Sequence, residues 1–289
     1  MISRRAVLIG GAGVVAAGVA GVLAVEGGLI PGRTTLHELL GLNGPAGEVP
    51  DAQPGPSARG EFVSAARLDA VCRWKVSYPP GSAVGDALPV VVALHGYGND
   101  HRAAFSTIGL DRFQAAAASP FAIAAVDAGN SYFHPRATGE DAGAMVLEEF
   151  VPLLASQGLD IERIGLIGWS MGGYGSLRLA SQLGADRVAA VVAVSPAMWA
   201  DGAHSPDGAF DDAGDYARHD LMGRQSELDG IPVRIDCGTG DGFQTIVQRY
   251  VEGFATPPDG GFEPGGHNGA YWRRVAPDEL AFLADHLAS

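Results

Sequence analysis

Residues 163–175 read RIGLIGWSMGGYG, and this stretch decides the fold of the chain. An apolar run typical of a buried strand ends at Gly168, and a helical pattern continues from Gly172. Ser170 therefore falls on a sharp turn between a strand and a helix, within a G-x-S-x-G motif. We interpret the two flanking glycines as places where the strand and helix backbones converge. This context favours Ser170 as a nucleophile over a glycine-rich turn that merely contains a serine.

Further apolar runs and helical patterns alternate on both sides of this motif. Strands are expected at residues 62–64, 71–76, 88–94, 121–126, 163–168, 188–194 and 231–237, and helices at residues 112–119, 145–154, 172–183 and 278–287. Continuous β-branched runs are typical of parallel strands that are buried on both faces. The sequence therefore predicts an α/β domain with a mainly parallel sheet and helices on both faces. Residues 196–230 are long enough for only a small cap, with Trp199 and Phe210 as its apolar contacts.

A serine hydroxyl is a poor nucleophile until a base takes its proton, so a histidine must follow Ser170. His204 and His219 precede the last expected strand, and His286 lies in the closing helix. His267 lies in a glycine-rich loop before that helix, from which it could reach the serine. We expect His267 to be the base; the alternative is that it is only an exposed turn residue.

In this architecture an acid lies between the serine and the histidine along the chain. Asp241 directly follows the last expected strand, at the edge where catalytic groups gather. Asp236 lies inside that strand, and Asp259 lies in a loop rich in proline and glycine. We therefore prefer Asp241 as the carboxylate that orients the histidine.

Two backbone N–H groups are expected to bind the oxyanion that forms during acyl transfer. Met171 begins the helix after the serine, and Tyr97 lies in the glycine-rich loop after the first long buried strand. His95 in the same loop could be mistaken for a base or, with His101, for a metal ligand. We interpret it as a buried histidine that holds the loop by hydrogen bonds. The sequence predicts no metal and no cofactor.

Substrate contacts are expected from Trp169 in the motif and from Tyr132 and His134 in the loop of residues 127–136. The same aromatic side chains could instead serve only to pack that loop.

The first 26 residues resemble an export signal. Arg4 and Arg5 precede about twenty uncharged residues that end in small side chains, as in a twin-arginine signal. An uncleaved membrane anchor is the alternative, since the apolar stretch is just long enough to span a bilayer. A glycine-rich nucleotide loop is a third interpretation, but the second strand and the acid that it requires are missing. Residues 27–59 are rich in proline and glycine and predict a tether with one short helix, so that residues 60–289 would form the catalytic domain.

The composition excludes several classes of function. Thirty-three acidic residues against 19 basic ones give a net charge of −14, which disfavours binding to nucleic acid or to an anionic membrane surface. Cys72 and Cys237 are the only cysteines, and they lie on strands that we expect to be far apart in the sheet. We therefore predict two free, buried thiols.

Several motifs together resemble the "putative esterase" family of α/β-hydrolases, which groups esterase-D-like enzymes, feruloyl and acetylxylan esterases, and secreted mycolyltransferases. The matching segments are LHG at 94–96, EEFVP at 148–152, IGWSMGGYG at 167–175, CGTGD at 237–241, GHN at 266–268 and YW at 271–272. The resemblance implies a triad of Ser170, Asp241 and His267, with Tyr97 and Met171 as oxyanion donors. The mycolyltransferases usually have aspartate where His95 stands, and esterase-D-like enzymes are usually cytosolic.

The leading hypothesis is therefore an exported serine esterase, secreted or anchored outside the cell membrane, that acts through an acyl-serine intermediate on a small-molecule, lipid or carbohydrate ester. An acyltransferase of cell-envelope lipids or sugars would use the same intermediate with a sugar hydroxyl as acceptor. A non-catalytic wall-binding relative is a third possibility, but it would have no need of the nucleophile.

Overall fold

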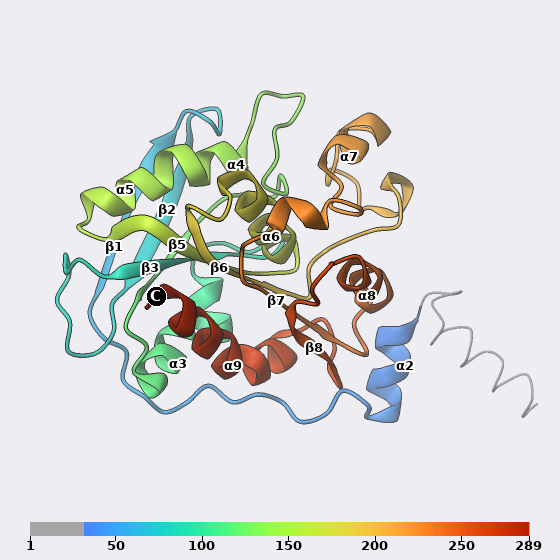
Figure 1. Ribbon diagram of the computed structural model, residues 1–289, viewed down its shortest axis with the longest axis horizontal. Coiled ribbons are helices and arrows are strands. Elements are labelled where there is room, and N and C mark those ends of the chain that lie inside the picture. The colour runs from blue at the N-terminus through green and yellow to red at the C-terminus, as the bar shows by residue number, and fades with distance from the viewer. Residues whose placement is uncertain (1–31, 289) are drawn as a thin grey trace, which may run out of the picture.

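Apolar β-branched strands form the centre of an eight-stranded sheet in the computed structural model, which describes residues 32–288 (Figure 1). The strands are β1 Ser57–Ser64, β2 Ala70–Ser77, β3 Pro89–Leu94, β4 Ala122–Val126, β5 Asp160–Trp169, β6 Val188–Val194, β7 Val233–Gly238 and β8 Asp259–Glu263. Their spatial order is β1-β2-β4-β3-β5-β6-β7-β8. The β1–β2 and β2–β4 pairs are antiparallel, and every other neighbouring pair is parallel. The predicted mainly parallel sheet is confirmed.

Alternate residues of the central strands supply two separate cores, one on each face of the sheet. Along β3, Val90 and Val92 belong to one core and Val91 to the other, because successive side chains of a strand point in opposite directions. The first core is covered by α5 Val151–Ser156, α6 Met171–Leu183 and α8 Gln244–Glu252. The second is covered by α3 Leu110–Ala117 and α9 Gly269–Leu287. The central strands are therefore buried on both faces of the sheet, as their continuous apolar runs predict.

Among the elements that differ from the sequence prediction are the unpredicted helix α8, the start of α9 and the edge strand β8. α9 begins at Gly269, nine residues before the predicted start at 278, although Pro277 lies inside it. Asn268 caps the helix by accepting hydrogen bonds from the N–H groups of Ala270 and Tyr271, and Tyr271 is buried in the core before the proline. β8 was not predicted, because an edge strand of sequence DGGFE has little apolar pattern.

The small cap predicted at residues 196–230 is present. It contains two short 3₁₀ turns and α7 Ala213–His219. Trp199 and Phe210 pack on the ring of Tyr132, with ring centroids 5.5 and 6.2 Å apart, so these aromatic rings fasten the cap to the loop after β4. The two cysteines are buried and free, as predicted.

The chain before the sheet packs along the domain. α2 Arg33–Leu40 lies beside α8, and the segment that follows it runs along α9 towards β1 (Figure 1). The expected export signal at residues 1–26 lies outside the described residues. Among residues 32–288, no helix is both long enough and apolar enough to cross a bilayer.

Two glycines allow β5 and α6 to approach each other closely. A Cβ atom on Gly168 would lie 2.2 Å from the carbonyl oxygen of Gly172, and one on Gly172 would lie 2.0 Å from that of Leu94. Backbone atoms cannot yield as the end of a flexible side chain can. The turn that carries Ser170 therefore requires glycine at both positions, as the motif suggested.

Gly168→Ala should lower the free energy of unfolding by about 3 kcal/mol, because the added methyl group overlaps backbone. Gly242→Ala is the matched control: it is exposed, and its nearest contact, Thr34 Oγ1, would be 3.9 Å away. The control should change stability by less than about 1 kcal/mol. Urea unfolding of both variants tests this, and equal stabilities would contradict the close-approach interpretation.

Two stacked histidines, His219 in the cap and His134 in the loop after β4, join these two segments. The rings of His134 and His219 have centroids 4.5 Å apart, and Nδ1 of His219 lies 2.9 Å from Asp215 Oδ1. Burial and the neighbouring His134 lower the pKa of His219 to about 4. In the unfolded chain His219 therefore takes up a proton near pH 6.5, whereas in the folded protein it does so only near pH 4. As the pH falls between these values, His219 lowers the free energy of unfolding.

The free energy of unfolding contributed by His219 should fall by about 2 kcal/mol between pH 7 and pH 5. His219→Gln removes this titration, so urea unfolding at the two pH values should show a smaller pH effect in the variant. His204→Gln is the control, because that side chain is 72% exposed and its loss should not reduce the effect. The same pH effect in wild type and His219→Gln would contradict the assignment.

Candidate active site

The backbone of Ser170 is held in an unusual conformation between β5 and α6. Its φ is 57° and its ψ is −118°, in the left-handed half of the map that side chains other than glycine rarely adopt. Three backbone hydrogen bonds fix it: the N–H of Ser170 donates to Val194, and its carbonyl accepts from Tyr174 and Ala197, at 3.0 to 3.1 Å. The neighbouring structure therefore imposes this strain on the turn.

Three loops bring the predicted serine, acid and histidine together at the carboxyl edge of the sheet. Nδ1 of His267 donates to Asp241 Oδ2 at 2.8 Å, and Ser170 Oγ lies 3.0 Å from Nε2 of the same ring. Asp241 is fully buried, and its other oxygen accepts from the N–H of Phe243 at 2.9 Å. The carboxylate thus holds a proton on Nδ1 and leaves Nε2 free to accept the serine proton.

Two aromatic rings enclose the imidazole of His267. The rings of Phe243 and Trp272 each have their centroid 5.2 Å from it, in edge-on arrangements. Trp272 is fixed in turn, because its Nε1 donates to Ser195 Oγ at 3.1 Å. The histidine is thus oriented by packing as well as by the acid. The residue pattern predicted no role for either ring, although both lie within five residues of a predicted triad member.

The two predicted oxyanion donors lie beside the serine. Met171 is the first residue of α6, so its N–H has no partner within the helix. A Cβ atom on Gly96, next to Tyr97, would lie 3.5 Å from the Cβ of Ser170. Among the described residues, neither N–H has a hydrogen-bond acceptor in the protein. Both are therefore free to donate to a bound ligand.

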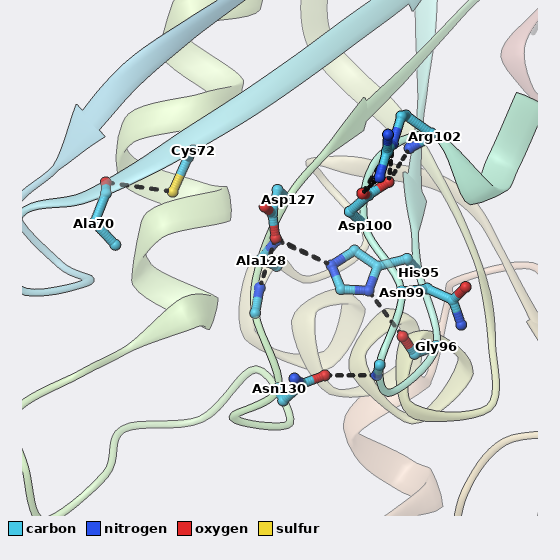
Figure 2. Close-up of polar contacts among 12 residues, drawn as sticks. Ala70, Cys72, His95, Gly96, Asn99, Asp100, Arg102, Asp127, Ala128 and Asn130 are labelled. Carbon is cyan, nitrogen blue, oxygen red and sulfur yellow. Dashed lines mark hydrogen bonds and ion pairs between the residues drawn. The ribbon is translucent and has the colours of Figure 1, made fainter.

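Buried hydrogen bonds hold the loop that carries Tyr97. His95 donates from Nδ1 to the carbonyl of Gly96 at 2.8 Å and accepts at Nε2 from the N–H of Ala128 at 3.0 Å (Figure 2). Asn130 Oδ1 accepts from the N–H of Gly98 at 2.7 Å. Burial lowers the pKa of His95, which keeps the ring neutral and able to accept. The interpretation of His95 as a structural histidine is confirmed.

The three predicted substrate contacts are not exposed in the structure. Trp169, Tyr132 and His134 have 2%, 3% and 0% of their surface exposed, so all three side chains are buried. Both ring nitrogens of His134 face carbonyl oxygens, those of Pro135 and Ala209. Tyr132 packs beneath the cap. The alternative, that these aromatics pack the loop, describes them better. Tyr97 is the ring that reaches solvent, with 53% exposed.

Asp236, the rival acid, is engaged elsewhere. Its carboxylate binds the guanidinium of Arg234 through two contacts of 2.7 and 3.1 Å. It therefore does not compete with Asp241 for the histidine.

One buried cluster of residues has the side-chain types that bind metal ions. Ligand atoms of His134, Asp215 and His219 lie within 4.8 Å of one another. The two imidazole planes are only 24° apart and stacked, so their in-plane lone pairs do not converge on one ion. This geometry does not suit a shared metal.

Comparisons with known proteins agree with this fold. The family model described as "Putative esterase" matches residues 66–283. No curated protein matches the chain. Three solved structures illustrate the likeness of fold: a ferulic acid esterase, FphF, which is a fluorophosphonate-binding serine hydrolase of Staphylococcus aureus, and an S-formylglutathione hydrolase from Agrobacterium tumefaciens.

The ferulic acid esterase has a TM-score of 0.69 at 19% identity, and the match covers 81% of this chain and 99% of that one. FphF has a TM-score of 0.66 at 20% identity, covering 80% and 99%. The S-formylglutathione hydrolase has a TM-score of 0.65 at 18% identity, covering 82% and 98%. The fold is that of the α/β-hydrolases. Because the family model spans most of the chain, the protein belongs to the "Putative esterase" family and is a carboxylic ester hydrolase.

Proposed function

We propose that the protein cleaves carboxylic esters through an acyl-serine intermediate on Ser170. The observation that carries this proposal is the continuous chain of hydrogen bonds from Ser170 through His267 to Asp241. A hydroxyl beside a neutral imidazole that is oriented by a buried carboxylate is the arrangement that activates serine.

In the first half of the reaction, Ser170 Oγ attacks the ester carbonyl as its proton passes to Nε2 of His267. The N–H groups of Tyr97 and Met171 bind the oxyanion that develops. The C–O bond to the alcohol then breaks, and His267 returns the proton to the departing oxygen. In the second half, His267 takes a proton from water and the hydroxide attacks the acyl-serine. The bond to Oγ then breaks, His267 returns the proton to Ser170 Oγ, and the acid leaves.

Ser170→Ala should reduce hydrolysis of a short p-nitrophenyl ester by at least about 10⁴-fold, because no other group can form the acyl intermediate. Circular dichroism should show an unchanged fold. A variant that retained turnover would refute Ser170 as the nucleophile.

Ser195→Ala provides a matched comparison for labelling by a fluorophosphonate. Ser195 also follows a central strand and also has a positive φ, 47° against 57° for Ser170. Its Oγ contacts Trp272 and not His267. The wild type and Ser195→Ala should each take up one label, and Ser170→Ala should take up none. A label on any other residue would contradict the proposal.

The same intermediate could pass its acyl group to a hydroxyl instead of water. Mass spectrometry of products formed with and without sugar acceptors separates the two outcomes. Free acid in the presence of acceptors supports the esterase proposed here, and a dominant acylated sugar would make the protein a transferase.

For localisation we propose export through the twin-arginine route, with the domain acting outside the cytoplasm. The support is the sequence of residues 1–26 alone, with its paired Arg4 and Arg5 before an uncharged stretch. Replacing both arginines by lysine should leave the protein in the cytoplasm, which cell fractionation would show. Unchanged export would contradict this route.

A further inference from the structure

The segment of residues 33–49, here called the strap, lies against both loops that carry the proposed acid and base. It lies outside the family match at residues 66–283 and was expected to be a tether. Arg33 donates to the carbonyl of Thr239 at 3.2 Å and to the side chain of Gln244. These two partners lie on either side of Asp241 in the chain. The strap is therefore in contact with the acid loop.

The strap is also fastened to α9, which begins directly after the histidine loop. The N–H of Gly47 donates to the carbonyl of Ala270 at 2.8 Å, and Arg273 Nε donates back to the carbonyl of Gly47 at 2.9 Å. Arg274 donates to the carbonyl groups of Asn43 and Pro45 at 3.2 and 2.5 Å. These bonds fix the strap at the position where it passes the two loops.

Asn43 lies between these two anchorages, and its carboxamide sits against both loops at once. A Cβ atom on Gly240, the residue before Asp241, would lie 2.4 Å from Asn43 Oδ1. A Cβ atom on Gly266, the residue before His267, would lie 3.3 Å from Asn43 Nδ2. One side chain thus packs against the backbone directly preceding each member of the acid–base pair. Glycine at both positions leaves the space that the carboxamide occupies.

The two loops follow the neighbouring strands β7 and β8, and the N–H of Thr239 donates across them to the carbonyl of Glu263 at 2.8 Å. Besides the bond between His267 and Asp241, the N–H of Gly240 donates to the carbonyl of Gly265 at 2.7 Å. Proton transfer requires the atoms to remain within hydrogen-bond reach, and small displacements of a catalytic group reduce the rate steeply. A side chain that packs on both loops limits how far they can move apart.

We propose that Asn43 is a positioning residue that holds the acid and histidine loops in register for catalysis. This inference rests on the proposed function of Ser170, Asp241 and His267. No hydrogen bond joins Asn43 to Ser170 among the described residues, and we expect Asn43 to affect turnover and not the binding of the ester.

Asn43→Ala should lower kcat for a p-nitrophenyl ester by about tenfold and leave KM within about twofold of wild type. The rate of fluorophosphonate labelling should fall in parallel. Leu39→Ala is the matched control in the strap, because Leu39 is 80% exposed, and it should leave both rates unchanged. Thermal unfolding of each variant confirms that the protein compared is folded. Asn43→Ser replaces Asn43→Ala if the alanine variant does not fold.

A folded Asn43→Ala with wild-type kcat and labelling rate would overturn the proposal. That result would not bear on the nucleophile, because turnover by Ser170→Ala tests that assignment separately.

Discussion

The strained turn at Ser170 is the constraint on which the rest of the site depends. The serine can occupy a left-handed conformation only because β5, β6 and the start of α6 hold its backbone on three sides. Those contacts require α6 to begin almost in contact with β3 and β5, which glycine at 168 and 172 allows. The core thus provides the free energy that keeps a hydroxyl projecting from the sheet edge beside two unpartnered N–H groups. The catalytic geometry is a property of the sheet as much as of the turn.

Successive layers of side chains surround this turn. The inner layer orients the histidine, and the outer layer holds the oxyanion loop and the cap. The histidine is oriented by a buried carboxylate and flanked by Phe243 and Trp272. Farther out, the oxyanion loop is held by the neutral ring of His95, and the cap by the aromatic cluster around Tyr132. Most of the aromatic residues near the site therefore support other groups, and only a few reach solvent. This division explains why residue type alone was a poor guide to substrate contacts.

The sequence predicted the features that depend on local pattern or chain order. The sheet, its central strands, the turn at Ser170 and the choice of Asp241 and His267 followed from apolar runs and from the positions of residues after strands. The start of α9 and the edge strand β8 did not, because tertiary packing carries a helix through Pro277 and pairs a glycine-rich segment with β7. The burial of His134 and the contacts of Asn43 depend on segments more than 70 residues away, which no local pattern encodes.

The strap has a consequence for how the site is assembled during synthesis. Its hydrogen-bond partners lie more than 200 positions away, for example 206 residues between Arg33 and Thr239 and 231 between Asn43 and Arg274. Contacts between residues so far apart in the sequence form late in folding, because forming them costs the conformational entropy of a very long loop. A ribosome makes the strap before the acid and histidine loops and before α9. The acid and histidine loops can therefore reach their final packing against the strap only after α9 has emerged from the ribosome.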